Sequence, residues 1–398
     1  MFQRSKTTII TGFLLLTAGM LLAAQPPPSH ADRDRTLDVP LGLPPLNAAQ
    51  LPVSKEVELG NKLFHDRRLS FNNTNSCSMC HIESQGLTSN QSSTAIGMEG
   101  RSLNRNAPAL YNVAYQKTLF HDGRESDLGH QAWGPLLSPL EMANPSVGYV
   151  IDKIRSLPDY NGMFEAAFDG QGANMETISS ALASFQRTLL SGNSPFDRWY
   201  YGKQENALTP EQKRGFEVFV GKGKCATCHE IGADGALFTD HKFHVTGIGY
   251  RVAIGDPNAI YKVELAPGVY TDITHKELKH ITNPLPNDIG RFAITLNAKD
   301  RWAYKTPSLR NVELTFPYMH DGSILTLEDV VDFYDKGGFD HDAEEVLTPL
   351  GLSPTEKSDL VSFLRALTSP EDEQKHMSHA AVAGTKTNRL PAPTKSGG

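Results

Sequence analysis

The chain has 398 residues and a formal net charge of −7 at pH 7. This acidic balance disfavours nucleic acid as a partner, because binding to phosphates requires a basic surface. The length is sufficient for two domains of ordinary size, and the 33 glycines and 25 prolines predict a large share of loops.

Residues 1–31 have the pattern of a secretory signal. Arg4 and Lys6 give a positive start, and residues 9–24 form an uncharged apolar run that small residues follow. An uncleaved membrane anchor is the alternative, but the run has 16 residues, whereas a helix needs about 20 to cross a bilayer. We therefore expect a periplasmic protein that is not integral to the membrane, with an extended, proline-rich lead-in at 32–52.

All four cysteines lie in two Cys-x-x-Cys-His motifs, which comprise Cys77, Cys80 and His81, and Cys225, Cys228 and His229. This spacing is typical of covalent haem c attachment. Two thioether bonds reach the two vinyl groups of one porphyrin, and the adjacent histidine becomes the proximal iron ligand. Two disulfides or a Cys/His zinc site are the alternatives. Two such motifs in one exported chain favour two covalently bound haems.

The chain also contains an internal repeat. Similar segments precede the two cysteine motifs, beginning at Gly60 and Gly215, and Ser-Phe-x-Arg-x-Leu segments follow them, beginning at Ser184 and Ser362. The cytochrome c fold requires such a pattern, because an N-terminal and a C-terminal helix cross while loops enclose the haem between them. We therefore predict a mainly α fold of two tandem cytochrome c-like domains, each with one covalent haem c.

The predicted domains are residues 53–200 and residues 201–369. Capping boxes with proline at the first helical position indicate helices in the second domain, one of them at the start of its closing helix. The polar stretch 238–300 carries β-branched segments and predicts a small irregular or β insertion. Residues 370–398 are polar and rich in Pro, Lys and Ser, so we expect a disordered tail there.

Several further motifs carry a family resemblance. In chain order they are Arg105-Asn106-Ala107-Pro108, Asp122-Gly123-Arg124, Gln131-Ala132-x-Gly134-Pro135, Glu141-Met142, Pro307-Ser308-Leu309-Arg310-Asn311-Val312 and Pro317-Tyr318-Met319-His320-Asp321-Gly322. The chain resembles the bacterial di-haem cytochrome c peroxidase and MauG superfamily over residues 54–367. The resemblance implies that the N-terminal haem reacts with hydrogen peroxide and that the C-terminal haem stores or relays oxidising equivalents.

The resemblance also assigns the peroxide site. It implies that Glu141 moves a proton between the two peroxide oxygens, that Gln131 positions the substrate and that Pro135 forms a wall. Judged by the residues alone, a surface loop is the more frequent setting for such side chains. The family match favours the catalytic interpretation.

A departure from the family concerns the first haem. Ordinary members have a second histidine upstream of the Arg-Asn-Ala-Pro segment, which ligates the iron at rest and leaves on reduction. This chain has no histidine between His81 and His121, and Ile96 and Met98 occupy that region. We therefore expect a five-coordinate or water-bound first haem in the ferric state, with Met98 as the alternative ligand.

The second haem has a candidate tyrosine ligand. Apolar residues from Leu327 to Tyr334 recur at helical spacing, so Tyr334 is expected on a buried helix face. Tyr334 lies 14 residues after His320, at a position that carries Met in the peroxidases and Tyr in MauG-like proteins. A phenolate favours ferric and higher states, whereas a thioether raises the reduction potential. Met319 and His320 are rival ligands, and packing in the core is the alternative role.

Two further sites follow from the resemblance. His121 stands where many members have a tryptophan that relays electrons between the haems. Asn106, Thr315 and Pro317 match a calcium site between the domains, where hard oxygen ligands suit Ca²⁺. By contrast, His241-x-x-His244 lacks a third ligand, and we expect solvated side chains there.

These features predict a di-haem oxidoreductase of the MauG-like branch. Its expected partners are hydrogen peroxide and a redox partner protein or an oxidisable protein substrate. A conventional peroxidase, supplied with electrons by a cytochrome c or cupredoxin, is the first alternative. A non-catalytic electron-transfer cytochrome is the second. Tyr334 favours the MauG-like branch over the first, and Glu141 argues against the second.

Overall fold

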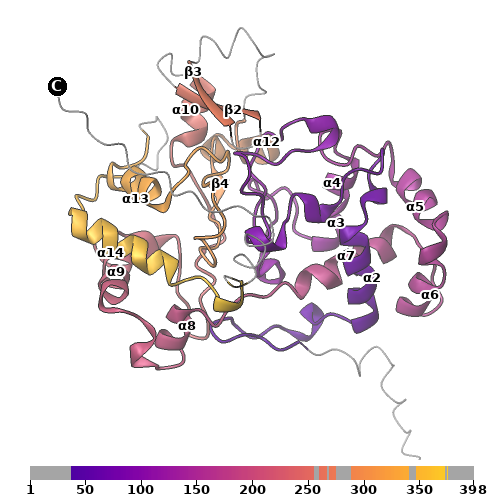
Figure 1. The fold of residues 1–398 in the computed structure, drawn as a ribbon, viewed down its shortest axis with the longest axis horizontal. Helices are drawn as coiled ribbons and strands as arrows, with labels where there is room; N and C mark the ends of the chain where they lie inside the picture. The colour runs from indigo at the N-terminus through magenta and orange to yellow at the C-terminus, as the bar shows by residue number, and fades with distance from the viewer. Residues whose placement is uncertain are drawn as a thin grey trace, which may run out of the picture. The chain divides into compact units, whose positions relative to one another are not determined.

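A computed structural model of the chain describes residues 37–254, 260–266, 269–274, 288–339, 347–372 and 374 (Figure 1). The expected signal at 1–31 lies outside this part of the chain. The described part is mainly helical with little sheet, as the sequence predicts. None of its helices is both long and apolar enough to cross a bilayer.

The N-terminal half is built on two crossed helices, α2 (Ser54–His65) and α7 (Met175–Arg187). A Cβ atom on Gly60 would overlap the carbonyl oxygen of Ala181 and crowd the side chain of Phe185. Glycine at this position therefore allows the close approach of the two helix backbones. Gly60 and Phe185 belong to the two repeated sequence segments, so this crossing is what the first copy of the repeat encodes.

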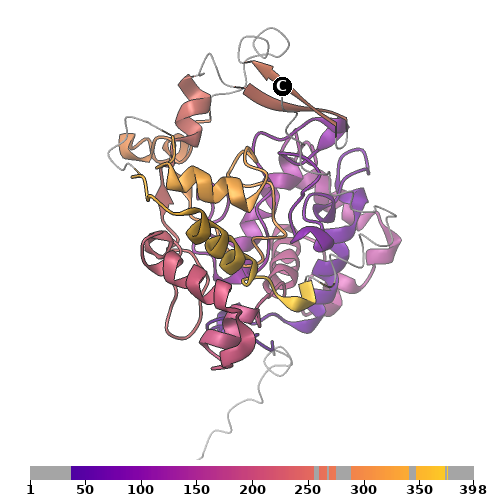
Figure 2. The ribbon, with the colours of Figure 1, turned by 60° about the vertical axis from the view of Figure 1, so that its left-hand side comes forward.

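The second copy of the repeat forms the same crossing from α9 (Pro210–Val220) and α14 (Pro354–Arg365). Here a Cβ on Gly215 would overlap the carbonyl oxygen of Asp359 and crowd Phe363. Both helices begin with a capping box and an early proline, as predicted. Figures 1 and 2 show the α2–α7 pair and the α9–α14 pair on opposite sides of the ribbon.

Shorter elements surround these two pairs. The remaining α-helices are α3 (Leu128–Gln131), α4 (Trp133–Leu137), α5 (Val147–Arg155), α6 (Met163–Ala167), α8 (Pro195–Tyr200), α10 (Ile248–Ile254), α12 (Phe292–Thr295) and α13 (Leu327–Asp335). The two cysteine motifs begin in single 3-10 turns, Cys77–Met79 and Cys225–Thr227. Much of the described chain is therefore loop, consistent with the glycine and proline content.

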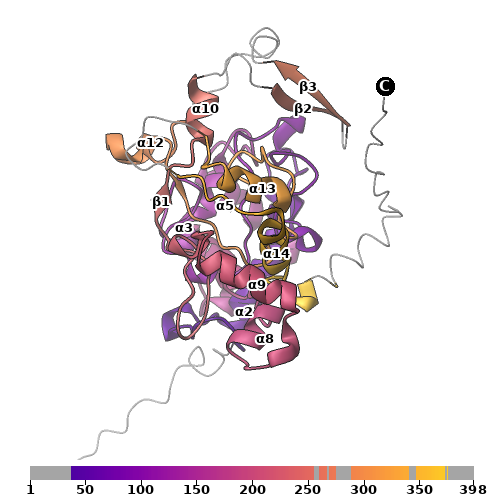
Figure 3. The ribbon, with the colours of Figure 1, turned by 90° about the vertical axis from the view of Figure 1, so that its left-hand side faces the viewer.

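The strands lie in and beside the predicted insertion at 238–300. β2 (Ile260–Ala266) and β3 (Val269–Thr274) form an antiparallel hairpin, and β1 (Phe243–His244) pairs with β4 (Tyr304–Lys305). Figure 3 shows the hairpin next to α10, away from the crossed helices. The insertion is thus a small β element on a helical framework, as its β-branched sequence predicts.

Each half has its own apolar core. The first is built from buried side chains that include Leu63, Phe64, Trp133, Ile154, Phe164 and Leu182. The second includes Phe196, Phe219, Phe238, Val331, Leu360 and Phe363. Cys77 packs against the first core and Cys225 against the second. Each cysteine motif therefore borders the core of its own half.

A buried ion pair ties the lead-in segment to the C-terminal half. The Arg310 guanidinium donates two hydrogen bonds to Asp197, at 2.8 and 2.9 Å. It also donates to the carbonyl oxygens of Gly42 and Ala236, at 2.6 and 2.7 Å. The pair is almost fully buried. All three guanidinium nitrogens thus donate to an acceptor, as a buried charge requires.

Asp197→Asn is expected to lower the free energy of unfolding by about 3 kcal/mol, because it leaves the buried Arg310 charge without its counter-charge. Chemical denaturation followed by circular dichroism measures the effect. Asp152→Asn is the matched control, since the Asp152–Arg155 pair is exposed and 3.9 Å apart and should contribute little. Equal midpoints for the two variants would contradict the prediction.

The packed part of the chain extends to Asp372, beyond the predicted end of the second domain at residue 369. Asp372 is buried, with an exposed fraction of 5%. Its carboxylate accepts hydrogen bonds from Tyr111 Oη at 2.9 Å, Ser191 Oγ at 2.5 Å and Asn311 Nδ2 at 3.2 Å. Asp372 is therefore buried, although the sequence placed it in a disordered tail. The rest of that tail, from residue 375, lies outside the described residues.

Candidate functional site

The histidine of the first cysteine motif is oriented by a backbone carbonyl. Nδ1 of His81 lies 3.0 Å from the carbonyl oxygen of Leu87. A carbonyl can only accept, so Nδ1 carries the proton and Nε2 keeps its lone pair. Burial lowers the pKa of His81, which favours the neutral imidazole that a metal ligand must be.

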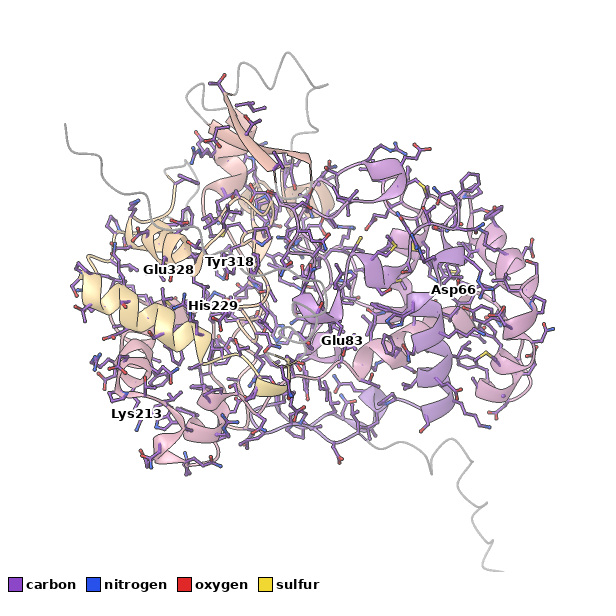
Figure 4. All side chains as sticks on the ribbon, viewed as in Figure 1. Asp66, Glu83, Lys213, His229, Tyr318 and Glu328 are labelled. Carbon is purple, nitrogen blue, oxygen red and sulfur yellow. The ribbon has the colours of Figure 1, made fainter. Side chains whose placement is uncertain are left out.

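The second motif repeats this arrangement. Nδ1 of His229 donates to the carbonyl oxygen of Phe238 at 2.8 Å, and burial lowers the pKa of His229. A fixed tautomer with a free Nε2 is the usual state of a metal-ligating histidine. Both motif histidines are thus prepared to bind iron (His229 is labelled in Figure 4).

Glu141 lies in the turn after α4, and its backbone is tied to the first motif. Its N–H donates to the carbonyl oxygen of Ser138 at 3.0 Å. Its carbonyl oxygen accepts from the Asn75 side chain at 3.1 Å, and Asn75 is two residues before Cys77. The turn that carries Glu141 is therefore held beside the first Cys-x-x-Cys-His motif.

The Glu141 carboxyl is in an unusual environment. Burial raises its pKa, against the opposing effects of a hydrogen bond from Ser138 and the positive charge of Arg124. Burial and, less strongly, the Glu141 charge raise the pKa of the Cys80 thiol. A partly buried carboxyl with a raised pKa is suited to proton transfer. Sequence reasoning missed Arg124 as its neighbour, although Arg124 belongs to the Asp-Gly-Arg motif.

The other two predicted residues of the peroxide site flank this turn. Pro135 lies in α4, and its carbonyl oxygen accepts from the N–H of Met142 at 3.1 Å. Gln131 ends α3, which contacts α4. Both side chains are half-buried. The structure brings Pro135 next to the Glu141 turn and places Gln131 on the adjoining helix.

The segment expected to hold a sixth ligand packs on the same turn. Met98 N–H donates to the carbonyl oxygen of Leu140 at 2.8 Å. The Met98 side chain is 3% exposed, whereas Ile96 is 46% exposed. Met98 is therefore buried next to the Glu141 turn, and it remains a candidate sixth ligand of the first haem.

Tyr334 projects from α13 toward the second motif. Burial and, to a smaller extent, the nearby Cys225 and Cys228 sulfurs raise its pKa. Its position on the helix agrees with the predicted inward face, since Leu327 and Val331 of α13 are buried. Tyr334 is half-buried, and a phenol beside this motif can act as an oxygen ligand or as a packing residue.

The chain matches the model of the family described as di-haem cytochrome c peroxidase over residues 54–205. The methylamine utilization protein MauG of Methylorubrum extorquens is 36% identical to it, over 79% of this chain and 78% of that protein. The chain belongs to the di-haem cytochrome c peroxidase family. It is therefore an oxidoreductase of a family that binds two haems.

Two further similarities cover more of the chain. Cytochrome-c peroxidase IdrP1 of a Pseudomonas species is 33% identical over 90% of this chain and 92% of that protein. The crystal structure of a MauG-like protein associated with microbial copper homeostasis has a TM-score of 0.68 and 28% identity, and it covers 86% of this chain and 98% of its own. Both MauG proteins and cytochrome c peroxidases are thus relatives.

His121, the predicted relay residue, forms hydrogen bonds with segments of both halves. Its Nε2 donates to the carbonyl oxygen of Asn106 at 3.0 Å, and its own carbonyl oxygen accepts from the N–H of Lys305 at 2.8 Å. Burial lowers the pKa of His121 to about 3. The imidazole is therefore neutral at physiological pH.

The rival ligand His320 lies in the same region. Its ring stacks on Tyr304 with 3.5 Å between ring centroids, and its carbonyl oxygen accepts from Asn106 N–H at 2.8 Å. Met319 precedes it with a positive φ of 73°. His320 thus contacts residues that join the two halves, whereas Tyr334 lies beside the second motif. This placement favours Tyr334 as the ligand.

Asn106 and Pro317, two of the expected calcium ligands, are in direct contact. The Asn106 amide lies 2.7 Å from the Pro317 carbonyl oxygen, and both residues are buried. Turning the amide over would point its oxygen toward the same place. The half-buried Thr315 is two residues before Pro317. The donor set is therefore made of hard oxygens, which fit Ca²⁺.

A carboxylate–histidine pair near the second motif was not predicted. Asp240 Oδ2 lies 2.8 Å from His244 Nε2, so His244 is not a solvated side chain as expected. Possible ligand atoms of Cys228, Asp240 and His244 lie within 4.8 Å of one another. Cys228 belongs to the second Cys-x-x-Cys-His motif, so this group adjoins the site at which the sequence predicts a haem.

Proposed function

We propose that the protein is a MauG-like di-haem enzyme. It would react with hydrogen peroxide at a haem attached to Cys77 and Cys80. It would share the oxidising equivalents with a second haem attached to Cys225 and Cys228. When bound, the two haems supply the redox-active iron. The observation that carries the proposal is the position of Tyr334 beside the second motif, in a family whose members are named both as MauG and as cytochrome c peroxidases.

The side chains around the first motif have distinct roles in this proposal. Glu141 would take up a proton from the peroxide and return it to the peroxide oxygen that leaves as water. Gln131 holds the peroxide by a polar contact, and Pro135 limits the space. His81 would hold the iron of this haem, with its ring oriented by the Leu87 carbonyl.

The ligands of the second haem would be His229 and Tyr334. A tyrosine oxygen is a harder, more negative donor than a methionine sulfur, so it stabilises ferric and higher oxidation states. Such a haem is a poor acceptor for electrons from a small cytochrome and a good store for an oxidant. The oxidising equivalents would then be delivered to an oxidisable protein substrate. Export to the periplasm, by the signal at 1–31, forms part of the proposal.

Calcium binding by Asn106, Thr315 and Pro317 leads to a prediction for the holoprotein. Chelation with EGTA is expected to change the haem absorption spectrum, because these residues join the halves next to His121. Added Ca²⁺ should restore the spectrum, and Asn106→Ala should make it insensitive to EGTA. Identical spectra before and after chelation would rule the site out.

Stopped-flow spectroscopy of the all-ferric holoprotein with one equivalent of peroxide tests the function. A fast Soret change that gives a long-lived oxidised species is the expected result. A reaction that starts only after one haem has been reduced would favour the conventional peroxidase instead. If the protein consumed peroxide no faster than free haem does, the non-catalytic electron-transfer cytochrome would be the remaining interpretation.

A further inference from the structure

A buried tyrosine is hydrogen-bonded to a buried carboxylate in a place that the proposed function does not use. The Tyr111 hydroxyl donates to Asp372 Oδ1 at 2.9 Å. The exposed fractions of the two residues are 7% and 5%. Ser191 and Asn311 donate to the other oxygen of the carboxylate. Three hydrogen bonds from different chain segments therefore hold the Asp372 carboxylate in place.

Tyr111 lies close to the first haem-attachment motif. It belongs to the same apolar cluster as Leu87, and Cys77 packs against that cluster. Leu87 provides the carbonyl that orients His81. Tyr111 is also three residues after Pro108, whose carbonyl interacts with the His81 ring. Tyr111 therefore packs in the apolar core that borders the first motif, in the chain segment that follows Pro108.

The hydrogen-bond partner decides whether a phenol can be oxidised easily. Loss of an electron makes the hydroxyl strongly acidic, so a base must take its proton. Tyr115, Tyr201, Tyr304 and Tyr318 donate to backbone carbonyls, which cannot hold a proton. Tyr111 donates to a carboxylate, which can. Burial and the Asp372 charge raise the pKa of Tyr111, so the phenol keeps its proton until it is oxidised.

Tyr160 provides a contrast within the same half. It also donates to a carboxylate, Asp66, at 2.9 Å. However, Arg68 forms hydrogen bonds with both oxygens of Asp66, and the Lys62 ammonium lies 4.2 Å from the Tyr160 ring centroid. Two positive charges make the carboxylate a weaker base and disfavour removal of an electron from the ring (Asp66 is labelled in Figure 4).

We propose that Tyr111 is a one-electron donor to the peroxide-oxidised first haem and that Asp372 is its proton acceptor. One electron passes from the phenol to the oxidised haem, which is thereby reduced by one equivalent. The hydroxyl proton moves to Asp372 Oδ1, giving a neutral tyrosyl radical and a neutral carboxylic acid. An electron from an external donor and the return of that proton regenerate both groups. This step rests on the proposed function, which supplies the oxidant.

Freeze-quench EPR of the holoprotein, mixed with one equivalent of peroxide, tests the proposal. Ring-deuterated tyrosine is incorporated to identify a tyrosyl signal by its narrowing. We expect such a signal in the wild type, its loss in Tyr111→Phe and its retention in Tyr160→Phe. Asp372→Asn keeps the shape of the acceptor but removes the base, so the radical should form at least about 100-fold more slowly.

The outcomes separate this inference from the proposed function. A Soret change without a tyrosyl signal, or with a signal undiminished in Tyr111→Phe, overturns the role of Tyr111 and leaves the peroxide chemistry standing. No Soret change in the wild type overturns both. The resting ferric spectrum reports whether each variant has an intact haem site. If Tyr111→Phe fails to bind haem, the Asp372→Asn variant tests the proposal instead. A tyrosyl radical that forms at the wild-type rate in that variant overturns it, and the slower formation expected above supports it.

Discussion

Replacing Glu141 by glutamine is expected to slow the reaction of the all-ferric protein with peroxide by about 100- to 10,000-fold. Glutamine has nearly the same shape but cannot take up and return a proton. Stability should not fall, because burial raises the pKa of Glu141 and a neutral side chain avoids the cost of a buried charge. Stopped-flow absorbance of the Soret band gives the rate constant.

The pH dependence of this reaction follows from the direction of the pKa shift. The carboxylate is the form that accepts the first proton, so the rate should fall as pH drops through the raised pKa of Glu141 and reach a plateau above it. In Glu141→Gln this limb of the pH profile should disappear. The same shift means that ionised Glu141 costs stability as pH rises, since the folded state binds the proton more tightly than the unfolded chain.

Glu176→Gln is the matched control for Glu141→Gln. Glu176 lies in the exposed first turn of α7 and should leave both the rate and the pH profile unchanged. A Glu141→Gln protein with the wild-type rate would remove Glu141 from the mechanism. The proton would then have to pass through another titratable group or a water molecule near the first motif.

Replacing Tyr334 by methionine should raise the reduction potential of the second haem by on the order of 0.1 V or more, within the roughly 0.8 V range that axial ligands span. The neutral sulfur stabilises ferrous iron, whereas the phenolate stabilises ferric iron. The long-lived oxidised species should then decay faster. Spectroelectrochemical titration measures the potential, and stopped-flow absorbance measures the decay.

Tyr334→Phe removes the oxygen without offering a new ligand, so the low-spin spectrum of the second haem should change. Tyr201→Phe is its control, because Tyr201 also lies in the C-terminal half and its hydroxyl donates to the Gly232 carbonyl, at 2.7 Å. Its spectrum should match that of the wild type. If Tyr334→Phe also retained the wild-type spectrum, Tyr334 would be a packing residue and His320 or Met319 would have to be reconsidered.

The features that the sequence alone determined are local or repeated. The Cys-x-x-Cys-His motifs require a fixed short spacing, and the capping boxes and helical periodicity involve residues within about two helical turns of each other. The repeat around Gly60 and Gly215 predicted two similar helix crossings, and both are present. Glu141 was reached through the order of family motifs, and Tyr334 through that order together with the helical spacing of the residues from Leu327.

Tertiary structure alone decided the contacts between distant segments. Backbone carbonyls orient His81 and His229, and every residue has a carbonyl, so no sequence pattern marks these two. Asp240 was an ordinary loop residue in the sequence, and only the fold places its carboxylate against His244.

The burial of Asp372 near the chain end is another contact that the sequence alone did not predict. The polar composition after residue 369 predicted disorder, yet Asp372 is buried against Tyr111 from a segment 261 residues away. Composition measures the average burial of a segment, whereas a single carboxylate can be buried when several donors from other segments meet it. Such convergence depends on how the two halves pack, and for that reason the Tyr111–Asp372 pair became visible only in the folded chain.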